Sequence, residues 1–223
     1  MAHELSPTVL FEDTHLIVLD KPAGLLSQGE HTGDENLVDW LRGYFGRNYV
    51  GLIHRLDRNT SGVMVVAKRT KAARRLTEAL RDGKLIRTYT AWLNGNLKKP
   101  ARWQHILSKD EKRNIVSVAA GNKEGAKTAV LSVIPVRHIR YQGRDLTLAE
   151  FRLETGRSHQ IRVQSAHEGH PVFGDTKYGG SHCGETGRPL LHSRRIEFPH
   201  PMSGEILKFE APLPEDMKLK QVS

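Results

Sequence analysis

The chain has 223 residues, of which 38% are hydrophobic and 26% charged, and its formal net charge is +9. This composition is that of a globular domain, and the basic balance favours a polyanionic partner, because neutralising phosphates releases counterions. The single cysteine, Cys183, excludes an intrachain disulfide, and no apolar run approaches the ~20 residues that span a bilayer. We therefore expect one cytoplasmic domain over residues 1–223, without membrane association.

The first predicted element is a strand over residues 15–19, where apolar residues follow one another. It ends at residues 21–24, Lys-Pro-Ala-Gly, since proline removes a ladder donor and glycine favours a turn. Leu37 and Leu41 then indicate a short helix, with Asp34 as its predicted N-cap.

The next stretch, residues 54–62, is the most distinctive of the chain. It reads HRLDRNTSG, so Asp57 lies between Arg55 and Arg58, and its last four residues predict a turn before an apolar strand over 63–67. Opposite charges nearby favour the ionised form of a carboxyl group, which suits a nucleophile or a general base. An exposed ion pair would use the same residues, but catalytic side chains are often presented at the end of a strand.

A helix is predicted over residues 70–81, with Thr70 as its cap and Gly83 as its stop. The β-branched and aromatic residues at 87–93 then predict a strand. Taken by itself, Tyr89 in this strand would be a packing residue with a solvated hydroxyl group.

The middle of the chain is predicted to be mostly extended. Residues 96–125 are polar and basic, and they predict a hairpin or loop that can contact a nucleic acid. Alternating apolar residues predict adjacent strands over 128–136 and 146–153, joined by a turn at residues 142–143.

A second polar cluster lies at residues 154–162, which read ETGRSHQIR. Ser158 is the predicted cap of a helix that reaches about Glu168. The amides of a helix start, with Arg157 and Arg162 nearby, make a natural anion site. An ordinary capped helix with solvated arginines would give the same pattern.

Near the end of the chain, the glycine-rich stretch over residues 179–187 predicts a loop. Its 12 histidines do not predict a metal site, since His167 and His170 lack the i, i+4 spacing of a zinc-binding helix. Phosphate-cradling and dinucleotide fingerprints are absent from the sequence, and we expect no cofactor.

Residues 54–62 resemble the HRLDxxTSG motif of the RluA-type RNA pseudouridine synthases. The resemblance covers about residues 9–214, with Gln164 as a departure where many members carry histidine. Further motifs follow the order of that family: KPAG at 21–24, Tyr-x-Ala and Asn-Gly within 89–95, TGRSHQIR at 155–162, and GHPVFGDTKYG at 169–179.

The resemblance implies roles for individual residues. Asp57 would be the catalytic residue, Arg162 would pair with it, and Tyr89 would contact the uracil and help to transfer a proton. Arg55 resembles the residue that enters the space left by a flipped-out base. A phosphate contact is the alternative role for Arg55. Other basic motif residues are expected to bind RNA: His54, Arg58, Arg157 and His159.

The resemblance also implies an α+β fold, with a mixed, largely antiparallel β-sheet flanked by helices and loops and an active site in a basic cleft. The enzyme would be an isomerase (intramolecular transferase) that converts uridine to pseudouridine in structured RNA, with rRNA expected first and tRNA second. A non-catalytic RNA-binding protein and a hydrolase that releases uracil are the alternatives. We expect a monomer without a protein partner and without an N-terminal S4-type domain.

Overall fold

The computed structural model describes residues 5–29, 33–121, 124–181 and 187–220. The chain divides into two compact units, residues 1–87 with 192–212 and residues 88–191 with 213–223. The single-domain expectation stays a prediction. In the described part of the chain, no helix combines the length and apolar character needed to cross a membrane.

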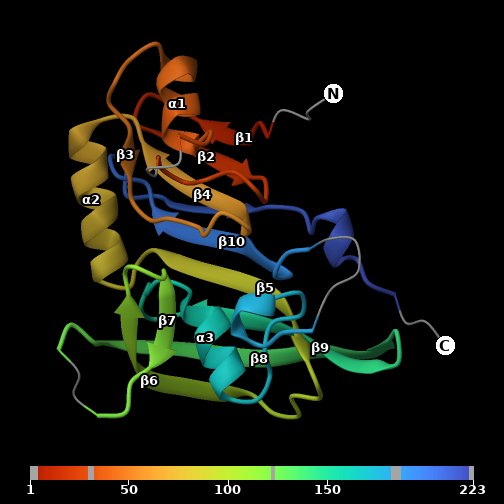
Figure 1. The fold of residues 1–223 in the computed structure, drawn as a ribbon. Coiled ribbons are helices and arrows are strands. Elements are labelled where there is room, and N and C mark those ends of the chain that lie inside the picture. Colours follow the sequence, from red (N-terminus) through yellow and green to blue (C-terminus); the bar gives the residue numbers. More distant parts are fainter. Residues whose placement is uncertain (1–4, 30–32, 122–123, 182–186, 221–223) are drawn as a thin grey trace. The chain divides into compact units, whose positions relative to one another are not determined.

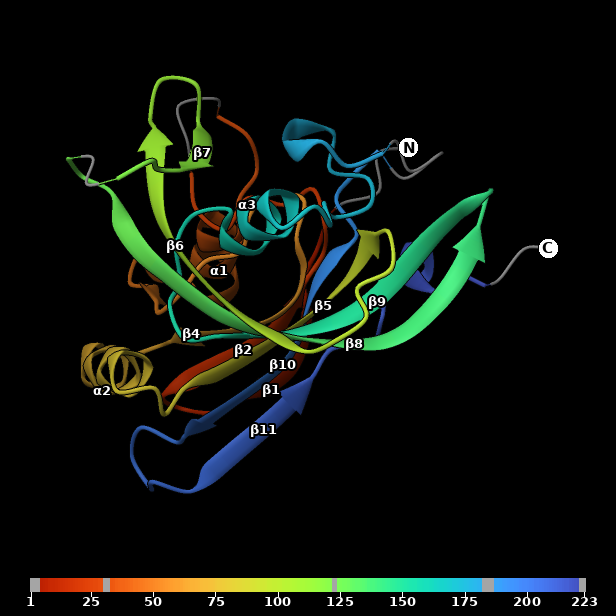
Figure 2. The same ribbon diagram turned by 90° about the horizontal axis from the view of Figure 1, so that it is seen from below.

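The first unit is built on the strands β1 (Thr8–Glu12), β2 (Leu16–Lys21), β3 (Gly51–Leu52), β4 (Ser61–Ala67), β10 (Leu191–Pro199) and β11 (Ile206–Glu210). Figure 1 labels the first five of these, and Figure 2 labels β11. Their order is β1-β2-β4-β10, with β11 paired to β10 and β3 paired to β4. β4 and β10 run parallel, while the other pairs in this unit are antiparallel. β1 was not predicted, because its three consecutive apolar residues at 9–11 are too short a run to identify a strand and do not alternate with polar ones.

Two helices belong to this unit, α1 (Leu37–Phe45) and α2 (Thr70–Arg81). Helix α2 lies along β3 and β4 (Figure 1) and buries Ala72, Leu76 and Ala79 in a core that includes Val63 and Val65 of β4. This apolar stripe at helical spacing is what makes residues 70–81 a helix, since most helix stability in proteins comes from such packing.

The predicted helix caps of the first unit were wrong. Asn36, and not Asp34, caps α1, and its side chain accepts a hydrogen bond from the Asp39 amide at 3.1 Å. Thr70 is the first residue of α2, and the cap position is occupied by Arg69 without a side-chain hydrogen bond. In both cases the helix boundary lies one or two residues away from the chosen capping residue, an error typical of sequence-based boundaries.

The second unit contains a sheet ordered β5-β9-β8-β6-β7, in which every neighbouring pair is antiparallel. Its strands are β5 (Ile86–Asn94), β6 (Ala101–Asp110), β7 (Ile115–Val118), β8 (Lys127–Tyr141) and β9 (Arg144–Leu153). The predicted pairing of adjacent strands is confirmed, and Figure 2 shows β8 and β9 as one long hairpin that extends beyond the predicted ranges. The polar segment 96–125 forms the β6–β7 hairpin in its described part.

Helix α3 (Gln160–His167) packs beside β6 and β7. Ser158 does not cap it: His159 occupies the cap position with φ +51° and makes no capping side-chain bond. Residues 182–186 of the predicted loop at 179–187 lie outside the described residues. With the three α-helices of the described chain and its largely antiparallel strand pairs, the α+β prediction is confirmed.

Gly62 cannot be replaced by a larger residue without distorting the sheet of the first unit. Its φ is +118°, and a Cβ atom there would lie 2.2 Å from the carbonyl oxygen of Ser193 on the parallel strand β10. We expect Gly62→Ala to lower the free energy of unfolding by about 3 kcal/mol or more, since strain and overlap add. For Gly83→Ala, at φ +70° with open space around the new Cβ, we expect about 1 kcal/mol. Urea unfolding of both variants tests this; equal losses would contradict it.

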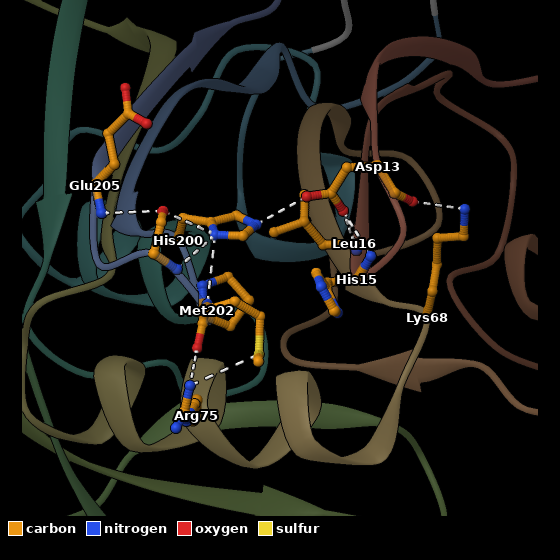
Figure 3. Close-up of polar contacts among 10 residues, drawn as sticks. Asp13, His15, Leu16, Lys68, Arg75, His200, Met202 and Glu205 are labelled. Carbon is orange, nitrogen blue, oxygen red and sulfur yellow. Dashed lines mark hydrogen bonds and ion pairs between the residues drawn. The ribbon is translucent and has the colours of Figure 1, made fainter.

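Asp13 ties the β1–β2 turn to the segment after β10 (Figure 3). Its Oδ1 accepts the amides of His15 and Leu16, both at 2.7 Å, and its Oδ2 accepts His200 Nε2 at 2.8 Å. Partial burial alone would raise the pKa of Asp13, but the hydrogen bonds from Leu16, His15 and His200 outweigh it and lower that pKa below its usual value.

The lowered pKa of Asp13 makes part of the stability depend on pH. A carboxyl group whose pKa is lower in the folded state stabilises the fold above its unfolded-state pKa, and this contribution is lost as the pH falls through the folded-state value. We expect wild type to exceed Asp13→Asn in unfolding free energy by about 1–2 kcal/mol at neutral pH, with the difference shrinking below about pH 4. Urea titrations across that range measure it, and a difference independent of pH would refute the explanation.

Candidate active site

Asp57 lies in the loop between β3 and β4, where its side chain is partly exposed. The amide of Thr60 donates a hydrogen bond to the Asp57 carbonyl at 3.0 Å, which closes a turn over residues 57–60. The turn was expected over residues 59–62, two residues later. β4 then begins at Ser61, and all of its residues are buried. Asp57 therefore lies in the loop that leads directly into a fully buried strand.

The backbone on both sides of Asp57 is fixed by an earlier segment of the chain. Ser27 Oγ donates to the Leu56 carbonyl at 2.7 Å and accepts the Leu56 amide at 3.1 Å. The Gly24 amide donates to the Arg58 carbonyl at 2.8 Å. These bonds hold the residues before and after Asp57, so the backbone that carries its carboxylate is fixed before any substrate arrives.

Lys21 adds a third attachment to the same loop. Its side chain is fully buried, and its ammonium group donates to the carbonyls of Pro22 at 2.9 Å, Leu25 at 2.7 Å and Arg58 at 3.2 Å. A buried ammonium group needs such acceptors, because desolvation is costly for a charge. The Lys-Pro-Ala-Gly sequence thus supports the Asp57 loop, a role that the strand-ending pattern alone did not indicate.

The two arginines beside Asp57 differ in their surroundings. Arg55 is exposed. The Arg58 guanidinium donates to Asp34 Oδ2 at 2.8 Å and to the Gly24 carbonyl at 3.1 Å, so it braces the loop while remaining half exposed. Asp34, expected to cap a helix, instead forms this ion pair.

His54 is buried in the first unit, and its Nε2 accepts the Val65 amide at 3.3 Å. Burial, with a smaller contribution from the Arg87 charge, lowers the pKa of His54 to about 3. The ring is therefore neutral at physiological pH and supports β4. A neutral, buried ring is a poor ligand for phosphate, which favours a supporting role for His54.

In the second unit, Arg162 is held by a carboxylate that the sequence analysis did not single out. Its Nε and Nη2 donate to Asp175 Oδ2 and Oδ1 at 2.7 and 2.8 Å, and both side chains are buried. The guanidinium also lies 5.0 Å from the centroid of the Tyr178 ring. This bidentate pair fixes the plane of the guanidinium. The Gly-Asp pattern at 174–175 was the available signal for Asp175.

The remaining candidates of the second unit are Arg157 and His159, just before α3, and Tyr89 within β5. The Tyr178 hydroxyl bonds His159 Nδ1 at 2.6 Å and accepts the Val116 amide at 3.0 Å. Arg157 is exposed, and its Nε donates to the Thr128 carbonyl at 2.9 Å. Tyr89 is a buried residue of β5, opposite Phe151 of β9.

Each unit thus gathers part of the predicted site. Asp57, Arg55, Arg58 and His54 share one loop of the first unit, and the arginines and histidine around α3 belong to the second. The pairing of Asp57 with Arg162 stays a prediction. Gln164, the departure from the family pattern, is buried in α3 and donates to the Trp103 and Ala129 carbonyls, both at 3.3 Å.

The sequence profile of the RNA pseudouridylate synthases matches residues 15–167, which is more than half of the chain. The chain belongs to this family. As a pseudouridine synthase it is an isomerase that converts uridine to pseudouridine in RNA. The loop around Asp57 and the start of α3 both lie within the matched residues.

Curated relatives of this synthase support the assignment. Ribosomal large subunit pseudouridine synthase D of Vibrio parahaemolyticus is 33% identical, over 97% of this chain and 70% of that protein. An uncharacterized RNA pseudouridine synthase of Bacillus subtilis is 36% identical, over 94% of this chain and 70% of its own length. The solved human RNA pseudouridylate synthase domain containing 1 has the same fold, with a TM-score of 0.77 at 22% identity over 95% of this chain and 85% of that chain.

Proposed function

We propose that this synthase isomerises a uridine in structured ribosomal RNA, with Asp57 as the catalytic residue. The observation that carries the proposal is the fixed Asp57 loop, whose neighbours Leu56 and Arg58 are bonded to residues 21–27. Relatives named ribosomal large subunit pseudouridine synthase C and D support ribosomal RNA over transfer RNA.

The reaction detaches uracil N1 from ribose C1′, turns the base and joins C5 to C1′. The proton lost from C5 balances the one gained at N1, so the RNA keeps its mass and no redox cofactor is required. Asp57 can begin this sequence by attacking C1′, by attacking C6 or by removing a sugar proton. Each route needs an ionised, positioned carboxylate.

Two residues of the second unit complete the proposed mechanism. Arg162 pairs with Asp57 and keeps it charged and oriented, which a charge-assisted hydrogen bond favours. Its bidentate bond to Asp175 holds the guanidinium plane for this task. Tyr89 stacks on the uracil and assists transfer of the C5 proton. The groups act together in a basic cleft.

Arg55 occupies the space vacated when the target uridine leaves its helix. A flipped base gives up stacking and pairing worth a few kcal/mol, and a guanidinium can stack in its place. We expect Arg55→Ala to reduce kcat/KM about tenfold or more on a stem-embedded uridine, and less on an unpaired one. Single-turnover assays on matched RNAs measure the difference. Equal losses on both RNAs would leave Arg55 as a phosphate contact.

The function is tested by mapping pseudouridines in total RNA from cells with and without the gene. Loss of one or more ribosomal RNA positions, restored by wild type and not by Asp57→Asn, is the expected result. Loss confined to transfer RNA would move the substrate to that class. Release of free uracil by the purified protein would indicate the hydrolase, and RNA binding without either product would indicate a binding protein.

A further inference from the structure

We propose that a pocket at the end of β4 remote from Asp57 binds a phosphate of the substrate RNA, an inference that rests on the proposed function. This β4-end pocket has a volume of about 560 Å³, and its lining includes Glu12, Tyr44, Phe45, Arg47, Lys68 and Arg69. All of these residues belong to the first unit.

The charges of the pocket leave an excess of cations. Lys68 Nζ donates to Glu12 Oε1 at 2.5 Å and to the Asp13 carbonyl at 2.7 Å, the second contact being drawn in Figure 3. The Lys68 hydrogen bond lowers the pKa of Glu12 against the opposing effect of partial burial, and the Tyr44 hydroxyl, donating at 3.0 Å, lowers it further. Lys68 and Glu12 thus neutralise each other, and Arg47 and Arg69 supply the excess.

Arg47 carries hydrogen-bonding capacity that the protein does not use. Its guanidinium lies 5.2 Å from the centroid of the Phe45 ring, and the Lys68 ammonium lies 5.4 Å from the same centroid. Within the described chain, Arg47 Nε and Nη2 have no acceptor although both atoms are shielded from solvent. Buried donors without acceptors are unfavourable, and a phosphate in the pocket would provide several acceptor oxygens to a guanidinium turned toward it.

The start of α2 adds a second feature that favours an anion. Arg69 lines the pocket and occupies the cap position of this 12-residue helix. It makes no side-chain capping bond in the described structure, and the first turn of α2 carries no acidic residue. Amides at such a helix start bear partial positive charge, so they attract phosphate oxygens.

An aromatic surface beside these cations favours a nucleic acid strand over an isolated phosphate ion. The Tyr44 side chain is half exposed, and its ring stacks on Trp40 with centroids 5.0 Å apart and planes at 13°. Exposed rings next to cations are how single-stranded nucleic acids are held, with bases on the rings and phosphates on the cations.

The position of the pocket defines what it can do. Asp57 precedes one end of β4 and Lys68 follows the other, so the strand separates them by roughly 23 Å at ~3.3 Å per residue. That span corresponds to about seven nucleotides stacked at ~3.4 Å. The pocket therefore anchors RNA flanking the target uridine, away from the reacting atoms.

The test compares Arg47→Gln/Arg69→Gln with Arg74→Gln/Arg81→Gln. The control pair removes the same charge from α2 positions whose side chains are 71% and 77% exposed. The probe is a labelled single-stranded oligouridylate long enough to reach both sites. For the pocket variant we expect about tenfold weaker binding at low salt and a slope of log Kd against log salt smaller by about 1.4, as for two lost phosphate contacts. The control should keep the wild-type slope.

Two further variants separate the contributions. Arg47→Lys/Arg69→Lys should restore most of the salt slope, since the charges return, while Tyr44→Leu should weaken binding without changing the slope. Far-UV circular dichroism of each variant identifies any that fails to fold. If Arg47→Gln/Arg69→Gln does not fold, Arg47→Lys/Arg69→Lys is compared with wild type in its place.

The proposal is overturned if the pocket and control pairs change affinity and slope equally. It is also overturned if inorganic phosphate binds wild type and not the pocket variant while both bind the oligouridylate alike, because the pocket would then serve a free anion. Pseudouridine formation by wild type is assayed separately. The pocket proposal can therefore be rejected while the proposed function stands, and an absence of pseudouridine would count against the proposed function alone.

Discussion

Asp57→Asn is expected to abolish pseudouridine formation while the protein stays folded and still binds RNA. An amide cannot act as a nucleophile or base, and the loop around position 57 is held by backbone bonds that the substitution leaves in place. We expect kcat to fall by about 10³-fold or more. Quantitative pseudouridine detection under single-turnover conditions, with RNA affinity measured in parallel, tests this.

Asp39→Asn is the matched control for Asp57→Asn. Asp39 is an exposed carboxylate of α1 that pairs with Arg42 at 2.8 Å, so its replacement changes the same charge outside the Asp57 loop. Turnover of this control should remain near that of wild type. If Asp57→Asn retained comparable turnover, Asp57 would lose its catalytic role and the proposed mechanism with it.

Asp175→Asn is expected to lower both stability and turnover. The change leaves the buried Arg162 guanidinium without its carboxylate, and breaking a buried pair from one side costs about 3 kcal/mol or more. Because the Arg162 plane is then no longer fixed, we expect kcat to fall at least about tenfold at temperatures well below unfolding. Urea unfolding and single-turnover kinetics on the same samples measure the two effects.

The second unit offers a matched control for Asp175→Asn. Arg188 donates to Asp216 through Nε and Nη2 at 2.6 and 2.7 Å, which is the same bidentate geometry with a more exposed carboxylate. Asp216→Asn should lower the unfolding free energy by about 1–2 kcal/mol and leave turnover near wild type. Equal turnover in the two variants would show that Asp175 serves stability alone.

The sequence predicted those elements whose signal is local. Val63–Ala67 in β4 and the pair β8–β9 follow from apolar runs and alternation, which need no knowledge of distant residues. The helix caps were missed because competing polar residues lie within a few positions of each boundary. Asp34 does not cap α1, because it pairs with Arg58, which is 24 residues away in the chain.

The support of the site was harder to predict than its motif residues. Asp57 and Arg162 lie in recognisable patterns, but Ser27, Lys21 and Asp175 act through contacts made after folding, over separations of 13 to 37 residues. The β4-end pocket is assembled from three separate segments of the chain. No local pattern joins such segments, so only a folded structure brings them together.

The full burial of Lys21 makes its chemical reactivity a measure of how often the surrounding segment opens. An amine-reactive reagent can modify this lysine only when the segment around it opens and its three carbonyl contacts separate. Since one of those carbonyls belongs to Arg58, labelling at Lys21 reports how often the loop that carries Asp57 loses this support. RNA that binds the closed loop should slow that labelling, so the labelling rate of Lys21 measures how far the loop is occupied by RNA.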